Sequence, residues 1–387
     1  MPDFDEFRKE RREPRERIAN RVLLAAFILF LCLPSAGYLL IADQSFSEIE
    51  NRYLAQFPAL RPARLWDGSL ALSLESYLAD QFPGRSFWVQ AKTTADACLG
   101  KKDIGGAYVG SDGRLFEKKD LPPSPLFREN IAYMLQLADG SGIPCTFLPV
   151  YSAAALYPEY LPPRAPLLNE RLLACELQAA LPPAVTVVDP WAELTAARAE
   201  DLYFRTDHHW TQTGAYHAFL ALAAQKGWTP MDWRPRAPEV PLFFGALYAQ
   251  APLPWLRGDR FFLWDDGMAA EAEIRFADTG ETASSPYIYD NLSKKDLYTV
   301  FLGGNHSETV IRTTAGSGQR LLILKDSFAH ALVPFLLPYY DEITMIDLRY
   351  FRSSLSERLQ EGDFTEICFI YNIAWFAADE NFRRAGE

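Results

Sequence analysis

Three of the five histidines of the chain lie within one short stretch, FRTDHHWTQTGAYHAF, at residues 204–219. An aspartate, Asp207, comes directly before the pair His208 and His209. In the pattern Asp-x-His a carboxylate can accept the Nδ1 proton of the imidazole and leave Nε2 free to take a proton from a nucleophile. Because the stretch runs into a predicted helix at 211–227, we expect the pair at an edge of a sheet. Asp207 and His209 are therefore predicted to act as an acid–base pair.

A serine that such a base could activate follows an apolar stretch much later in the chain. In LLILKDSFAHALVP, a predicted strand at 321–324 runs into Lys325, Asp326 and Ser327, and a helix is expected from Phe328 or just after. Such a serine lies at the carboxyl end of a strand, where open α/β sheets bind ligands. It also lies at a helix N-terminus, whose N–H groups can stabilise an oxyanion. The alternative is that Asp326 and Ser327 only cap the helix.

Other polar residues follow strand ends or occupy loops. Arg349, in DLRY, could hold a substrate carboxylate or polarise an ester carbonyl. Its alternative role is a buried ion pair with Asp326 or Asp347. Asn305 in LGGNHSE and Asn372 in IYNIAW could donate hydrogen bonds to an oxyanion, and are otherwise ordinary loop or turn residues.

A metal site is the alternative interpretation of the histidine-rich stretch, because Asp207, His208, His209 and His217 are all possible ligands. Adjacent histidines point in different directions in regular structure, and the H-x-x-x-H spacing of helical zinc sites is missing. We therefore expect neither a metal nor a cofactor, and take His208 and His217 as bystanders. His330, one helical turn after the serine, could face the site but is expected to bond to solvent or backbone.

The chain of 387 residues carries a net charge of −12, which argues against nucleic-acid binding. A predicted cytoplasmic tail at 1–21 is strongly basic, and an uncharged run at 22–42 is long enough to cross a membrane as an uncleaved signal-anchor helix. A cleaved signal peptide is the alternative. A stalk is predicted at 43–120 and an α/β domain at 121–387, with an insertion at about 228–319.

The α/β domain is predicted from alternating helices and strands, which favour a parallel sheet covered on both faces. Helices are expected at 125–140, 166–181 and 211–227, strands at 145–151, 185–190, 321–324, 342–348 and 366–371, and a hairpin at 107–117. The insertion is expected to hold loops and a hairpin attached to this sheet. Its tryptophans would suit sugar stacking or packing; they are Trp228, Trp233, Trp255 and Trp264. The cysteines outside the apolar run, which show no paired spacing, are interpreted as small core residues.

Four segments, in order, resemble the motifs of bacterial DHHW-family proteins, which are similar to the periplasmic alginate O-acetyltransferase-like branch of the SGNH hydrolases. The segments are RTDHHWTQTGAYHAF, LLILKDSFAHALVPFL, MIDLRYF and YNIAWFAADENF. The resemblance covers most of residues 46–382 and implies a flavodoxin-like, three-layer α/β/α sandwich of SGNH-hydrolase type with a mostly parallel sheet. It implies Ser327 as nucleophile, His209 as general base and Asp207 as its orienting partner. Lys325 is a further candidate for contact with substrate or oxyanion, but it replaces the glycine of typical SGNH enzymes, so their oxyanion geometry is not implied.

The resemblance also implies a membrane-anchored, extracytoplasmic enzyme that transfers or hydrolyses O-acetyl groups on a polysaccharide. A transferase of this kind would need a membrane-bound O-acetyltransferase partner that supplies acetyl groups from the cytoplasm. An esterase would use the same residues and differ only in the acceptor. The alternative of a different class is a catalytically inactive polysaccharide-binding or scaffold protein of the cell envelope.

Overall fold

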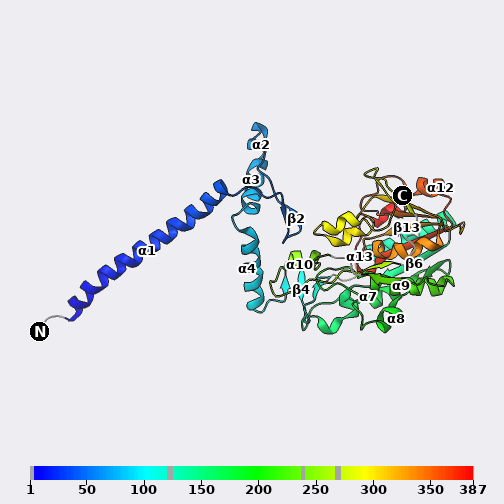
Figure 1. The fold of residues 1–387 in the computed structure, drawn as a ribbon, viewed down its shortest axis with the longest axis horizontal. Helices are drawn as coiled ribbons and strands as arrows, with labels where there is room; N and C mark the ends of the chain where they lie inside the picture. Colours follow the sequence, from blue (N-terminus) through cyan, green and yellow to red (C-terminus); the bar gives the residue numbers. More distant parts are fainter. Residues whose placement is uncertain (1–3, 120–124, 237–239, 266–271, 387) are drawn as a thin grey trace. The chain divides into compact units, whose positions relative to one another are not determined.

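The computed structural model describes four stretches of the chain, residues 4–119, 125–236, 240–265 and 272–386 (Figure 1). They form two compact units that divide between Lys92 and Thr93, and each unit is described by itself. The predicted boundary between stalk and α/β domain, at residues 120–121, lies outside the described residues, as do residues 1–3 of the predicted tail.

The first unit begins with one long helix, α1 (Phe4–Leu40). Its segment Glu16–Leu40 is 25 residues long, is not buried by the rest of the chain, and is long and apolar enough to cross a membrane. Its composition also suits a signal sequence near the N-terminus. The remaining elements of this unit are β1 (Phe46–Ser47), β2 (Arg52–Tyr53), α2 (Pro62–Trp66) and α3 (Ser69–Asp80), and α4 (Arg85–Cys98) runs across the division.

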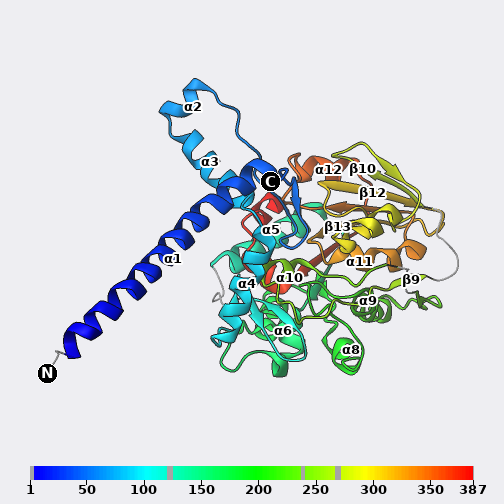
Figure 2. The ribbon, with the colours of Figure 1, turned by 60° about the vertical axis from the view of Figure 1, so that its left-hand side comes forward.

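The second unit is built on an eight-stranded sheet in the order β11-β10-β12-β14-β13-β15-β6-β7. Its strands are β6 (Cys145–Val150), β7 (Val185–Val187), β10 (Ala272–Phe276), β11 (Thr282–Ala283), β12 (Glu308–Thr313), β13 (Arg320–Lys325), β14 (Glu342–Ile346) and β15 (Glu366–Asn372). The five strands from β14 to β7 are parallel, whereas β12, β10 and β11 pair antiparallel. Figure 2 shows β10 beside β12. The fold is therefore α/β, and the sheet that was expected to be mostly parallel is mixed.

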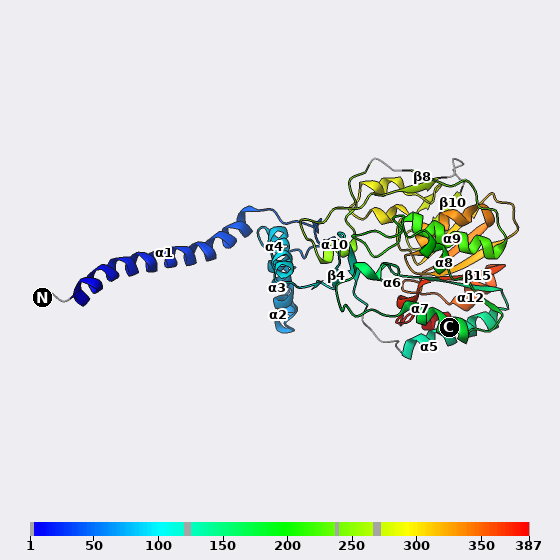
Figure 3. The same ribbon diagram turned by 90° about the horizontal axis from the view of Figure 1, so that it is seen from below.

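The antiparallel strands come from the predicted insertion and confirm that it is attached to the sheet. The antiparallel strands β10 and β11 are joined by a short hairpin connection, whereas parallel strands need longer crossover connections, which are usually helical. The α-helices between the parallel strands include α6 (Ala153–Leu156), α7 (Glu170–Ala180), α8 (Trp191–Ala196), α9 (Gln212–Lys226), α11 (Ala329–Leu332) and α12 (Leu355–Glu361). Helix α5 (Pro125–Ser141) precedes β6, and α13 (Ile373–Phe376) follows β15. Figure 3 shows α9 on one side of the sheet and α5 and α12 on the other.

Helix α9 matches the predicted helix, and the histidine-rich loop lies directly before it. Thr211 is its N-cap, whose side chain accepts from the Gly214 N–H, and Gly227 ends it in the left-handed conformation. On the opposite side of the sheet, Phe147 of β6 and Phe369 of β15 stack and belong to the buried core. The two strands pair in parallel register up to Asn372 and Val150, so their carboxyl ends lie side by side.

The helix expected after Ser327 is much shorter than predicted. α11 has four residues and continues as a 3₁₀ helix, η4 (Val333–Tyr339), because Pro334 and Pro338 lack the N–H groups that an α-helix needs. The remaining elements are β3 (Asp103–Ile104), β4 (Ala107–Val109), β5 (Leu115–Glu117), η1 (Pro158–Tyr160), β8 (Arg234–Arg236), α10 (Ala246–Gln250), β9 (Leu263–Asp265), η2 (Tyr289–Ser293), η3 (Leu297–Val300) and η5 (Phe382–Gly386).

The cysteines only partly follow the expectation that they are core residues. Cys145 and Cys368, on the adjacent strands β6 and β15, are buried, but Cys98 and Cys175 are exposed on helices. All are free thiols in this structure. Both exposed cysteines lie on helices, Cys98 on α4 and Cys175 on α7, and the apolar character of the residue does not reveal which side of a helix faces the core.

Candidate active site

Ser327 lies in the turn between β13 and α11, at the carboxyl end of a strand with parallel neighbours on both sides. Asp326 fixes this turn because its carboxylate accepts from the N–H groups of Phe328, at 3.0 Å, and Asn372, at 2.7 Å. The N-cap residue of α11 is Phe328, without a side-chain cap. Ser327 therefore does not cap the helix, and its hydroxyl is available for another partner.

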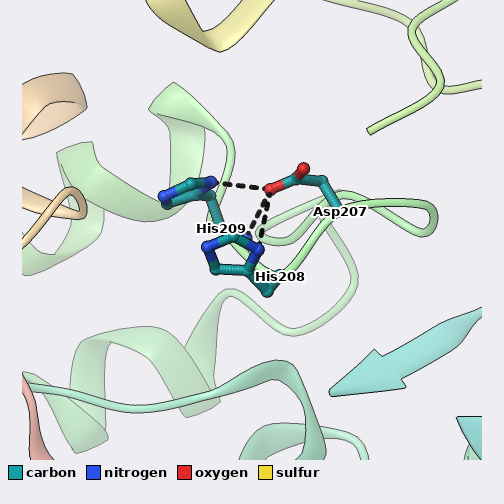
Figure 4. Close-up of side chains that lie close together, drawn as sticks. All are labelled: Asp207, His208 and His209. Atoms are coloured by element: carbon teal, nitrogen blue, oxygen red, sulfur yellow. Dashed lines mark hydrogen bonds and ion pairs between the residues drawn. The ribbon is translucent and has the colours of Figure 1, made fainter. Parts of the chain in front are cut away.

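That partner is His209, which comes from the loop before α9. Its Nε2 lies 2.7 Å from the Oγ of Ser327. Its Nδ1 lies 2.6 Å from Oδ1 of Asp207, and Figure 4 shows this contact. Asp207 also accepts from the N–H groups of His209, at 2.9 Å, and Ala246, at 2.7 Å. The structure thus brings Asp207, His209 and Ser327 into one hydrogen-bonded chain, although the histidine and the serine are 118 residues apart.

Burial and neighbouring groups set the protonation states of His209 and Asp207. Burial and the neighbouring His208 lower the pKa of His209 to about 4, against the opposing effect of Asp207. Burial by itself would raise the pKa of Asp207, but the two imidazoles and the hydrogen bonds to it hold that pKa below the usual range. At neutral pH the imidazole is therefore neutral and the carboxylate ionised, which is the pair of states that a general base requires.

The imidazole is held in place by an aromatic residue of the insertion, Tyr298 in η3. Its ring lies parallel to that of His209 with 3.8 Å between the centroids, and its hydroxyl donates to the carbonyl oxygen of Ser327 at 3.2 Å. The indole of Trp210 donates to the carbonyl oxygen of Phe328 at 2.9 Å. Tyr298 was not among the predicted site residues, because no local motif surrounds it and its contacts form only in the fold.

Gly245, also in the insertion, packs directly against the carboxylate of Asp207. A Cβ at this position would lie 2.3 Å from both Cβ and Oδ2 of Asp207. Its backbone is extended, so the glycine is needed for close approach rather than for an unusual φ.

We expect Gly245→Ala to displace Asp207 and to slow the labelling of Ser327 by phenylmethylsulfonyl fluoride. A misplacement of about 1 Å costs about 100-fold in rate. The rate is measured by intact-protein mass spectrometry, with circular dichroism to verify the fold. Gly140→Ala is the matched control because nothing lies within 4 Å of a Cβ there. Labelling of Gly245→Ala at the wild-type rate would contradict the packing argument.

Arg349 forms the ion pair that was its alternative role. Its Nε donates to Oδ1 of Asp347 at 2.9 Å and a terminal nitrogen to Oδ2 at 2.6 Å, so the acid is Asp347 and not Asp326. The Arg349 side chain remains 36% exposed, and the residue also lines the cavity that contains Ser327. A role towards substrate therefore stays compatible with the ion pair.

Lys325 points away from the serine that follows it and into a buried charge cluster. Its ammonium, on a side chain 2% exposed, lies 3.0 Å from Oδ2 of Asp347 and 2.7 Å from Nε2 of His330. Burial lowers the pKa of Lys325, and burial and the lysine charge together lower the pKa of His330. His330 therefore bonds to Lys325, and the expectation of a solvent or backbone partner is wrong.

The two candidate oxyanion donors have different surroundings. The side-chain oxygen of Asn305 accepts from Arg349 at 3.3 Å and faces the ammonium of Lys325 at 3.4 Å. The side-chain oxygen of Asn372 accepts from the Trp375 N–H at 3.1 Å and so caps α13. Its Nδ2 is buried and has no hydrogen-bond partner among the described residues. Neither residue lines the cavity with Ser327, and their oxyanion role stays a prediction.

Asp207, His208 and His209 are also close enough to be tested as metal ligands, with potential ligand atoms within 4.8 Å of one another. Nδ1 of His208 lies 3.7 Å from the same oxygen of Asp207 that faces His209 (Figure 4). Both ring nitrogens of His209 already have hydrogen-bond partners. An ion would have to replace one of these bonds, so the donor set fits proton transfer better than ligation. His217 is directed to Glu200, at 3.4 Å.

A cavity of about 280 Å³ opens beside Ser327. Its lining includes His208, Asp326, Arg349, Tyr371, Trp375 and Asp379. A serine bonded to a buried His–Asp pair, at the end of a central parallel strand and open to a cavity, defines an α/β protein with the parts of an acyl-transfer site.

Comparison with known proteins gives two overlapping family matches. The family described as "DHHW protein" matches residues 187–346, and the family described as "SGNH hydrolase-like domain, acetyltransferase AlgX" matches residues 108–232. The first match contains all three residues of the hydrogen-bonded chain. These matches confirm that the chain resembles DHHW proteins and the AlgX-like SGNH-hydrolase group.

Individual relatives agree with these matches. The chain is 28% identical, over 181 residues, to "Probable alginate O-acetylase AlgJ" of Pseudomonas putida, a match that covers 44% of this chain and 46% of the relative, or about half its length. A DHHW family protein from Eubacterium siraeum has a similar fold, with a TM-score of 0.61, 24% identity and coverage of 72% of this chain and 97% of that one. Bacillus cereus PatB1 likewise has a TM-score of 0.61, at 17% identity, with coverage of 71% and 98%.

Proposed function

We propose that the protein is a membrane-anchored, extracytoplasmic enzyme that transfers or hydrolyses O-acetyl groups of a polysaccharide through Ser327, His209 and Asp207. The hydrogen-bonded chain from Asp207 through His209 to Ser327 carries the proposal. The names of the matched family and of the Pseudomonas relative, which refer to acetyltransferase and O-acetylase activity, support the acyl group. The parallel half of the sheet corresponds, in this proposal, to the flavodoxin-like α/β/α sandwich of SGNH hydrolases.

In the proposed reaction His209 takes the proton of Ser327 while Oγ attacks the carbonyl carbon of an acetyl ester. The tetrahedral intermediate then expels the alcohol, to which His209 returns the proton, and leaves acetyl-Ser327. A second hydroxyl or water, deprotonated by His209, attacks this ester and restores the serine. Asp207 stays ionised and stabilises the imidazolium that forms twice in this cycle. The backbone N–H of Ser327, with Arg349 at the cavity, is the proposed source of oxyanion stabilisation.

The membrane arrangement follows from the N-terminal sequence. In this proposal residues 22–42 of α1 cross the membrane, the basic tail stays in the cytoplasm, and the site lies outside. Because activated acetyl groups are made in the cytoplasm, a transferase in this position needs a membrane partner that exports them. An esterase would need no such partner, so the requirement for one distinguishes the two reactions.

The test is acetyl-ester hydrolysis by the full chain in detergent, followed by acetyl transfer to oligosaccharides scored by mass. Phenylmethylsulfonyl fluoride is expected to add one sulfonyl group, on Ser327. A chain that neither hydrolyses 4-nitrophenyl acetate nor reacts with the sulfonyl fluoride would instead be the inactive polysaccharide-binding or scaffold protein.

The acid side of the pH profile follows from the burial of His209. The base works only when neutral, so kcat/KM is expected to fall about tenfold per pH unit below about pH 4, where the histidine takes up its proton. An ordinary histidine would place this fall near pH 6.5. Between these values the unfolded chain binds a proton that the folded chain resists, so acid also destabilises the fold. Circular dichroism at each pH separates the two effects, and a fall centred near 6.5 in a folded protein would contradict the prediction.

A further inference from the structure

We propose that the cavity beside Ser327 binds an uncharged polysaccharide and that Trp375 is the platform on which a sugar ring stacks. The inference rests on the proposed function and adds to it the class of substrate and a residue that selects it. Two independent observations carry it, the support of the Trp375 side chain and the charges around the cavity.

Trp375 lies in α13, directly after the central strand β15, and lines the cavity that contains Ser327. Its side chain is 46% exposed, whereas most large aromatic residues of this unit are buried. An exposed indole beside a nucleophile offers a flat, electron-rich face to the C–H groups of a pyranose ring. The position therefore suits recognition of a sugar that carries the reacting ester or hydroxyl.

The indole is also held in place. The ammonium of Lys119 lies 4.7 Å from its ring centroid and donates to the side-chain oxygen of Asn372 at 2.9 Å. The same oxygen accepts from the backbone N–H of Trp375. Asn372 thus ties the lysine and the tryptophan together from a fully buried position. A fixed aromatic ring loses little conformational entropy when a ligand binds.

The charges of the cavity disfavour an acidic polymer. Six charged residues line it, two basic and four acidic: Lys325, Arg349, Asp326, Asp347, Asp379 and Glu380. Both basic side chains are paired with Asp347. Asp379 and Glu380 follow α13 in the sequence, and Glu380 is exposed. A polyuronate such as alginate would meet net negative charge here, whereas an uncharged sugar would not.

The tryptophans of the insertion do not offer this platform. Trp233 and Trp264 are buried, and Trp228 stacks on Tyr339 with 4.2 Å between ring centroids, so packing explains all three. Trp255 is 53% exposed but does not line the cavity. It therefore provides a matched control for Trp375, with the same residue type and similar exposure.

The experiment compares esters in the full chain in detergent. Wild type is expected to deacetylate O-acetylated xylohexaose with a kcat/KM at least tenfold above that for O-acetylated hexamannuronate. Trp375→Ala is expected to lower the xylohexaose value about tenfold more than the value for 4-nitrophenyl acetate, and Trp375→Phe to recover most of it. Trp255→Ala should change neither. The double variant Asp379→Asn, Glu380→Gln is expected to reduce the ratio of kcat/KM for xylohexaose to that for hexamannuronate.

A binding measurement tests the role of Trp375 independently of the proposed reaction. Calorimetry of the Ser327→Ala chain with xylohexaose is expected to show binding that Trp375→Ala weakens about tenfold. This result would stand even if wild type hydrolysed no ester, in which case only the proposed reaction fails. The inference would be overturned if Trp375→Ala lowered kcat/KM equally for all esters, or if wild type preferred hexamannuronate. It would also be overturned if xylohexaose did not bind, or bound equally well to the Trp375→Ala variant.

Discussion

Ser327→Ala is expected to lower the rate of 4-nitrophenyl acetate hydrolysis by about 10⁴-fold or more, to the level that binding and oxyanion stabilisation alone can support. The reason is that the alanine leaves no oxygen for His209 to deprotonate, while the turn itself is fixed by Asp326 and not by the serine side chain. The fold should therefore be retained. The release of nitrophenolate, followed at saturating and limiting ester concentrations, gives kcat and kcat/KM.

The control for this variant is Ser293→Ala. The hydroxyl of Ser293 is exposed and donates to the carbonyl oxygen of Asp290, away from the cavity. Its removal should leave hydrolysis within twofold of wild type. If Ser327→Ala kept more than a few per cent of the wild-type rate, the hydrogen-bonded chain would not be the source of activity, and the proposed reaction would have to be abandoned.

Asp347→Ala is expected to lower the free energy of unfolding of the second unit by about 3–5 kcal/mol, because it leaves the charge of Lys325 buried without its acidic partner. It also removes the acceptor that orients Arg349. Burial would raise the pKa of Asp347, but Lys325 and Arg349 hold it below the usual range, so this carboxylate is ionised at neutral pH. Urea unfolding followed by tryptophan fluorescence measures the loss.

The matched control is Asp232→Ala, which breaks an exposed pair with Arg234 at the surface. Exposed pairs contribute about 0–1 kcal/mol, so its unfolding curve should nearly overlay that of wild type. If the Asp347 variant unfolded like this control, the cluster around Lys325 would not be a buried, ionised unit. The orientation of Lys325 away from Ser327 would then have lost its physical explanation.

The three residues of the hydrogen-bonded chain could be predicted because each belongs to a local pattern. Asp207 and His209 precede a capped helix, and Ser327 follows a strand, so their positions at the sheet edge follow from the elements. The break in the helix after Ser327 was also within reach, since Pro334 and Pro338 are visible in the sequence.

Contacts made across the insertion were out of reach. Tyr298 and Gly245 meet His209 and Asp207 only after β10 and β12 have joined the sheet, and no spacing in the sequence encodes that pairing. The mixed character of the sheet has the same origin. The direction of the Lys325 side chain likewise depends on Asp347 at the end of the neighbouring strand, and not on the serine that follows it in the sequence.

The separation of His209 and Ser327 by 118 residues has a consequence for folding. In the proposed mechanism the hydroxyl becomes nucleophilic only when His209 has been brought to Ser327 and the insertion has docked, and such non-local closure is among the slower steps of folding. A polypeptide whose serine reacts is therefore one that has completed its topology. In the proposed mechanism the reactivity of Ser327 would therefore count natively folded molecules, which the amount of polypeptide does not.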